Sequence, residues 1–96
     1  MPADYAWIVT ADFLSGDDAG TTGPHDAPDQ FGDDWSFRAF RLYDGDDTLC
    51  YMGILAAADL DAEPAAFGPL DDFGRPNAGC TRIDHFREPG GVWETI

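Results

Sequence analysis

Two runs of apolar residues dominate the hydrophobic pattern, and a short polar segment, residues 44–47, separates them. The run over 35–43 is rich in aromatic side chains, and the run over 48–56 is mostly aliphatic. The separating segment reads Asp-Gly-Asp-Asp. An Asp-Gly step between such runs is a strong hairpin signal, because glycine accepts the positive φ that tight turns need. We therefore predict a central β-hairpin over residues 35–56.

Apolar residues fall on both predicted faces of this hairpin. One face carries Phe40, Leu42, Leu49, Tyr51 and Leu55, and the other carries Trp35, Phe37, Ala39, Cys50, Met52 and Ile54. A hairpin that is apolar on both faces is not expected to leave one of them in water. The rest of the chain is therefore predicted to cover both sides. Along the first run, apolar residues occupy odd-numbered positions as far as Ala39 and even-numbered positions from Phe40 to Leu42. This switch favours either a β-bulge or burial on both sides.

Shorter apolar runs predict further strands on either side of the hairpin. Residues 5–14 place Tyr5, Trp7, Val9 and Phe13 on one face of a strand and Ile8 on the other. Residues 80–87 alternate as a strand, and residues 92–96 close the chain as a last strand. A short helix is allowed near 57–63 by its alanine content, although Pro64 prevents a long one. Together these elements predict a mainly β fold, with α+β as the alternative. We expect a single domain over residues 1–96: a curved antiparallel sheet of about five strands, half closed into a barrel, with at most one or two short helices.

Two segments are predicted to be loops. Residues 15–34 form a long acidic stretch rich in Gly, Asp and Pro. A loop of this length inside a compact domain is usually functional or disordered. Its one large apolar side chain is Phe31, which we expect to pin it to the core. Residues 70–79 also read as a loop, with two tight turns.

The charge of the chain is its most unusual feature. Nineteen acidic residues face five arginines and no lysine, which gives a formal net charge of −14, and sixteen of the acids are aspartates. Such a field repels nucleic acid and anionic membranes and attracts basic protein surfaces. We therefore expect a basic protein as the partner, with no direct binding to nucleic acid or to a membrane.

Acidic clusters in the N-terminal third and in the hairpin turn are the candidate contact residues. Carboxylates two apart on a strand lie about 6.6 Å from each other, which approximates the separation of successive backbone phosphates. A set of such carboxylates could occupy an arginine-lined nucleic-acid groove. The candidates are Asp17, Asp18, Asp26, Asp29, Asp33, Asp34, Asp44, Asp46 and Asp47. The alternative is an acidic surface that serves only solubility or adaptation to high salt.

Other chemistry has little support in the sequence. The carboxylates of 59–63 and of 44–47 could attract a hard cation, but neither segment matches the EF-hand pattern, so we expect no cofactor and no dedicated metal site. His25 and His85 each lie beside an aspartate, but outside any nucleophile motif. Apolar neighbours of Cys50 would raise the pKa of its thiol instead of activating it. We therefore expect a protein that is not an enzyme.

The two cysteines and the N-terminal segment indicate the cellular compartment in which the protein is expected. Cys50 and Cys80 fall in predicted strands and form no CxxC pair, so two buried, reduced thiols are favoured, with a disulfide as the alternative. The first residues lack the basic and apolar regions of a secretory signal, and no apolar run has the length of a membrane span. These features predict a cytoplasmic protein.

Four segments also carry a resemblance: WIVT (7–10), GTTGPHDAP (20–28), FRLYDGDDTLCYMG (40–53) and PLDDFGRPNAGCTRI (69–83). In this order they resemble uncharacterised small acidic proteins of actinobacterial phages and mobile elements. The group supplies no catalytic residues. By analogy of size, charge and context, the resemblance implies a DNA-mimic inhibitor of a host defence nuclease, such as CRISPR or restriction machinery. A phage structural or assembly accessory protein, acidic only for solubility, is the runner-up, and a small enzyme is the third possibility.

Overall fold

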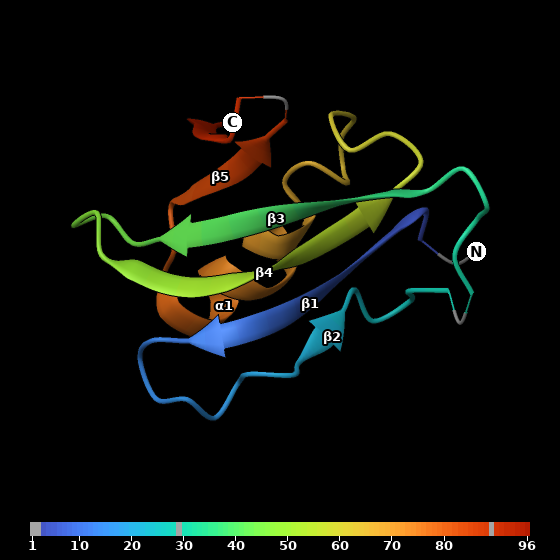
Figure 1. Cartoon of the computed structure of the whole chain (residues 1–96). Coiled ribbons are helices and arrows are strands. Elements are labelled where there is room, and N and C mark those ends of the chain that lie inside the picture. Colours follow the sequence, from blue (N-terminus) through green and yellow to red (C-terminus); the bar gives the residue numbers. More distant parts are fainter. Residues whose placement is uncertain (1–2, 29, 89) are drawn as a thin grey trace.

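A six-stranded antiparallel sheet forms the body of the molecule (Figure 1). The computed structural model describes residues 3–28, 30–88 and 90–96. Within them the strands are β1 (Tyr5–Asp12), β2 (Thr22–Gly23), β3 (Ser36–Tyr43), β4 (Leu49–Ala57), β5 (Arg82–Arg87) and β6 (Val92–Thr95). Their order across the sheet is β2-β1-β4-β3-β5-β6, so the sheet is open, with β2 and β6 at its edges. The predicted mainly β, single-domain fold class is confirmed.

The β3–β4 hairpin lies at the centre of the sheet, as predicted. Phe40 pairs with Gly53 and Leu42 with Tyr51, and the pairing shifts between Leu42 and Tyr43. The expected bulge is therefore present, but it lies nearer the turn than the predicted position between Ala39 and Phe40. The positive φ of the turn, 61°, belongs to Asp47 and not to the glycine of the Asp-Gly step.

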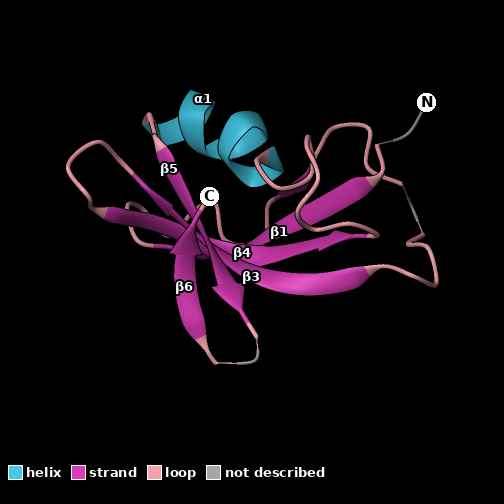
Figure 2. Cartoon of the chain, turned by 90° about the horizontal axis from the view of Figure 1, so that it is seen from above, coloured by secondary structure: helices cyan, strands magenta, loops and turns pink. Residues whose placement is uncertain are grey.

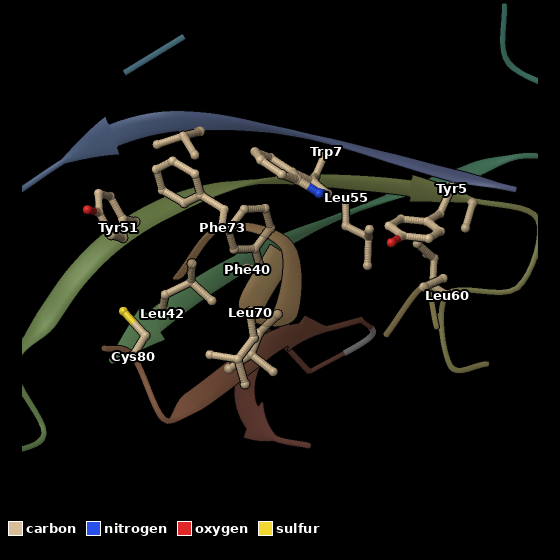
Figure 3. Packing of buried hydrophobic residues seen from close by; sticks show 14 of the residues in the cluster. Tyr5, Trp7, Phe40, Leu42, Tyr51, Leu55, Leu60, Leu70, Phe73 and Cys80 are labelled. Atoms are coloured by element: carbon tan, nitrogen blue, oxygen red, sulfur yellow. The ribbon is translucent and has the colours of Figure 1, made fainter. Parts of the chain in front are cut away.

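One face of the sheet carries the hydrophobic core (Figure 3). Phe40, Leu42 and Leu55 from the hairpin have no exposed surface, and Trp7 and Val9 of β1 extend the same layer. This layer packs beneath a helical segment made of a π-helical turn, Leu70–Gly74, and the short helix α1 (Arg75–Ala78).

The position of the helical segment corrects two predictions. The expected helix near 57–63 is absent from the structure, and residues 70–79, expected to form a loop, contain the helical segment instead. Leu70 and Phe73 are three residues apart and reach the core together, as helical spacing allows. Gly79 ends the helix with a φ of 65°, the left-handed conformation that favours glycine at this position.

Smaller corrections concern strand ends and one loop. The first strand ends at Asp12 instead of Leu14, and Phe13 beyond it is exposed. The strand predicted over 80–87 begins at Arg82, so Cys80 lies just before it. The 15–34 loop contains the two-residue strand β2, and its Phe31 is 45% exposed instead of buried in the core.

The second face of the sheet is only partly covered, contrary to the prediction that both sides would be buried. In Figure 2 the helical segment lies on one side of the sheet only. On the other side, Trp93 of β6 packs on Phe86, and the Arg41 guanidinium lies 3.9 Å from the Trp93 ring centroid. Farther along, Phe37 is 63% exposed and Ile8 is 39% exposed. Part of the second face of the central hairpin, around Phe37, therefore stays exposed.

The two phenylalanines of β3 provide a matched test of this asymmetry. Phe40→Ala should lower the free energy of unfolding by about 3–5 kcal/mol, because it leaves a cavity in the core. Phe37→Ala removes the same atoms from an exposed position and should change it by no more than about 0.5 kcal/mol. Chemical denaturation of both variants measures the difference. Equal losses would mean that the two faces are buried alike.

Candidate functional site

Six aspartates gather where β1 ends and the hairpin turns. Asp12 pairs with Tyr51, and the backbone N–H of Phe13 donates to the Cys50 carbonyl, so the loop after β1 lies beside the first residues of β4. The β3–β4 turn immediately precedes those residues, and Figure 1 shows both loops at the same end of the sheet. We call this end the acidic end and define it as Asp12, Asp17, Asp18, Asp44, Asp46 and Asp47.

Asp44 fixes the hairpin turn through its own side chain. Its Oδ1 accepts hydrogen bonds from the backbone N–H groups of Asp46, at 2.8 Å, and Thr48, at 3.0 Å. Asp47 makes an ion pair with Arg82, with 2.7 Å between Oδ1 and Nη1. Asp46 is exposed, and no ion pair in the described part of the chain involves it. The turn therefore holds one paired and two unpaired carboxylates in a fixed backbone.

Asp12 organises the neighbouring loop in the same way. Its carboxylate accepts hydrogen bonds from the backbone N–H groups of Leu14, Ser15 and Asp18, at 2.9–3.2 Å, and from the Ser15 hydroxyl at 2.9 Å. Desolvation acts to raise the pKa of Asp12, but the hydrogen bonds outweigh it and lower that pKa to about 2. Asp12 thus stays ionised at any physiological pH, and it holds the loop that carries Asp17 and Asp18. The sequence analysis missed this residue; the signal was an Asp at a strand end followed three residues later by Ser.

The other predicted contact residues lie at the opposite end of the sheet. Asp26, Asp33 and Asp34 belong to the segment between β2 and β3, and the Asp26 carbonyl accepts a hydrogen bond from the N–H of Ala3, which precedes β1. The eight residues of β3 separate this segment from the hairpin turn by about 25 Å. Asp29 is outside the described residues. The structure therefore divides the predicted set into two groups instead of joining them on one face.

The five arginines neutralise few of these charges. Arg38 and Arg87 share Asp61, and Arg87 also pairs with Glu94. Arg75 pairs with Asp71, and Arg82 bridges Asp47 and Asp84. Arg41 stacks on Trp93. Within the described residues, Asp47 is the one carboxylate of the acidic end that pairs with an arginine.

Groups that could carry out chemistry are buried or isolated. Cys50 and Cys80 are free and buried, and burial, reinforced by the neighbouring Cys50, raises the pKa of the Cys80 thiol to about 12. A thiol with that pKa is protonated at neutral pH, so it is a poor nucleophile. In residues 3–28, 30–88 and 90–96, no group of three or more His, Cys, Asp or Glu side chains is placed to hold a metal ion. Over the same ranges, no helix has the length and apolar character needed to cross a membrane.

His85 lies in the core with no exposed surface. Its Nδ1 is 3.3 Å from Nη1 of Arg38, which can only donate, so Nδ1 accepts and Nε2–H donates to the Ala66 carbonyl at 2.9 Å. The ring is therefore neutral. Burial lowers the pKa of His85 below its usual 6.5; the hydrogen bond to Ala66 opposes this shift, and the charges of Arg38 and Arg87 add to it.

No protein-family model, curated protein or solved structure matches this chain.

The buried histidine predicts a pH dependence of stability. Below pH 6.5 and above the folded pKa of His85, the unfolded chain binds a proton that the folded chain does not. The free energy of unfolding should therefore fall as the pH is lowered through this window, by at most about 1.4 kcal/mol per pH unit. His85→Gln should flatten this slope in pH-dependent denaturation. Parallel curves for wild type and His85→Gln would show that His85 is not the titrating group.

Proposed function

We propose that the chain is an acidic, non-catalytic binding protein that occupies a basic, nucleic-acid-binding surface of a partner protein. The observation that carries the proposal is the acidic end, where six aspartates lie at the end of β1 and on two adjacent loops. Two of them, Asp12 and Asp44, hold those loops through hydrogen bonds to backbone N–H groups. The backbone that carries the other carboxylates is thus held in place before binding, which reduces the entropy lost when a complex forms.

Electrostatics favour this role over direct contact with nucleic acid. A net charge of −14 steers the chain toward surfaces rich in Lys and Arg and away from phosphate backbones. Proteins that bind nucleic acid present such basic surfaces, and much of their affinity comes from neutralising phosphates. Carboxylates of the acidic end would take the place of those phosphates.

The resemblance to acidic proteins of actinobacterial phages supports a more specific form of this proposal. A mobile element gains from a small protein that blocks a host defence nuclease, such as CRISPR or restriction machinery. The chain would then act as a DNA mimic in the cytoplasm of the host cell. An accessory protein of phage assembly, acidic only for solubility, is the competing function, and it predicts no specific role for the acidic end.

Three carboxylates of the acidic end can be neutralised without touching the hydrogen bonds that hold the loops. The variant D17N/D18N/D46N keeps side-chain size and removes three negative charges. A matched control, D4N/E63Q/E88Q, removes the same charge at exposed positions away from the acidic end. The partner is first captured from host lysate at moderate salt, and its affinity for wild type and for both variants is then measured.

The acidic-end variant should bind this partner at least about tenfold more weakly than wild type, which corresponds to about 1.4 kcal/mol. The control should stay close to wild type, and duplex DNA should compete with the wild-type protein. Both variants should remain folded, because exposed carboxylates contribute little to stability. If the control weakens binding as much as D17N/D18N/D46N, or if DNA does not compete, mimicry by the acidic end is wrong.

A further inference from the structure

The open face of the sheet contains an apolar groove at the end opposite the acidic end. Ile8 of β1, Ile54 and Ala56 of β4 and Phe37 of β3 line its sheet side. The other side is lined by Pro24, His25, Ala27, Pro28 and Phe31. Its volume is about 580 Å³, within the range of about 300–1,000 Å³ typical of ligand-binding clefts. The groove is thus large enough to hold side chains of a partner.

Exposed aromatic rings border this groove. Phe31 stacks on Trp35 with ring centroids 5.0 Å apart, and it lies 6.0 Å from the Phe37 ring. Phe37 is the most exposed of these rings, at 63%. Clustered aromatic side chains that remain exposed beside a groove are typical of the residues that supply most of the energy in protein interfaces.

Carboxylates accompany the aromatic cluster along the same segment. Asp26 follows His25, which lines the groove, and Asp33 and Asp34 lie between the stacked rings of Phe31 and Trp35 in sequence. All three are exposed, and no ion pair in the described ranges involves them. Apolar side chains therefore make up most of the groove lining, and the segment between β2 and β3, which forms one side of it, also carries three exposed carboxylates.

We propose that this groove binds a peptide segment of a partner protein in which an apolar anchor is flanked by Lys or Arg. The apolar anchor would cover Ile8, Ile54 and Phe37, and the basic residues would meet Asp26, Asp33 and Asp34. Charge complementarity selects this occupant over a second copy of the chain, because two copies would bring the same carboxylates together, each on a molecule of net charge −14. The same charge disfavours bases stacking on the rings. This proposal concerns a different end of the sheet from the acidic end and does not depend on it.

The test is a selection from a phage-displayed library of random short peptides against the immobilised full-length protein. Enriched peptides should combine apolar residues with flanking Lys or Arg. A peptide synthesised from the enriched consensus then gives dissociation constants for four variants by fluorescence anisotropy. Phe37→Ser should weaken binding about tenfold or more. D26N/D33N/D34N should weaken binding and reduce its salt dependence.

Two controls separate this site from the rest of the surface. Val92→Ser removes an exposed apolar side chain from β6, outside the groove, and should leave the affinity unchanged. D17N/D18N/D46N should also bind the peptide normally, so failure of the acidic-end proposal and failure of this one can be told apart. In the unaltered protein, amide NMR signals of Ile8 and Ile54 should shift on adding the peptide, which does not depend on any variant folding.

Several results would overturn the proposal. One is a selection that enriches no peptide. Another is an enriched set of peptides that are basic but share no apolar position. A third is a consensus peptide that binds the Phe37→Ser variant as tightly as it binds wild type. Self-association in sedimentation that is lost in Phe37→Ser would assign the face to a second copy instead.

Discussion

Phe73 packs the helical segment against the sheet. Its ring lies 5.4 Å from that of Trp7 and 4.7 Å from that of Tyr51, so it joins β1, β4 and the helical segment (Figure 3). The adjacent Asp72 accepts hydrogen bonds from the Tyr5 hydroxyl at 2.7 Å and the Trp7 indole N–H at 3.1 Å. These contacts fix which face of the sheet becomes the core. The short remainder of the chain then covers only part of the other face, and the groove beside Phe37 stays open.

Close approach at two glycines makes this packing possible. A Cβ on Gly53 would lie 2.4 Å from the Phe40 ring, and one on Gly74 would lie 3.0 Å from Leu42 and from Cys80. Both distances are shorter than ordinary van der Waals contact, so the backbone reaches its partners only without a side chain. Such close contacts add to the packing that opposes the mutual repulsion of nineteen acidic residues. Loops and strand ends can then carry unpaired carboxylates.

The sequence predicted the centre of the fold better than its margins. The hairpin over 35–56 was predictable because its two apolar runs and its Asp-Gly turn agree. The helical segment was not, because Gly74, Pro76 and Gly79 are common in loops, and only its packing on the sheet makes that stretch helical. Tertiary packing likewise decided which hairpin face is buried, since Phe37 and Phe40 are the same residue type on one strand.

The candidate site was predictable in composition but not in arrangement. The sequence identified Asp17, Asp18 and the turn aspartates, and it could not reveal that pairing of β1 with β4 brings their loops together. Nor could it show that Asp26, Asp33 and Asp34 lie at the far end, beside an apolar groove. Strand order sets both arrangements, and strand order depends on contacts between residues distant in sequence.

Hydroxyl-radical footprinting with mass spectrometry tests the unequal burial of the two faces most directly. In dilute wild-type protein, the rings of Phe37 and Phe31 should be oxidised readily, and those of Phe40 and Phe73 should be protected, because the first two are exposed and the last two are buried. Protection of Phe37 to the same degree as Phe40 would contradict the account, since it would mean that the second face of the sheet is covered.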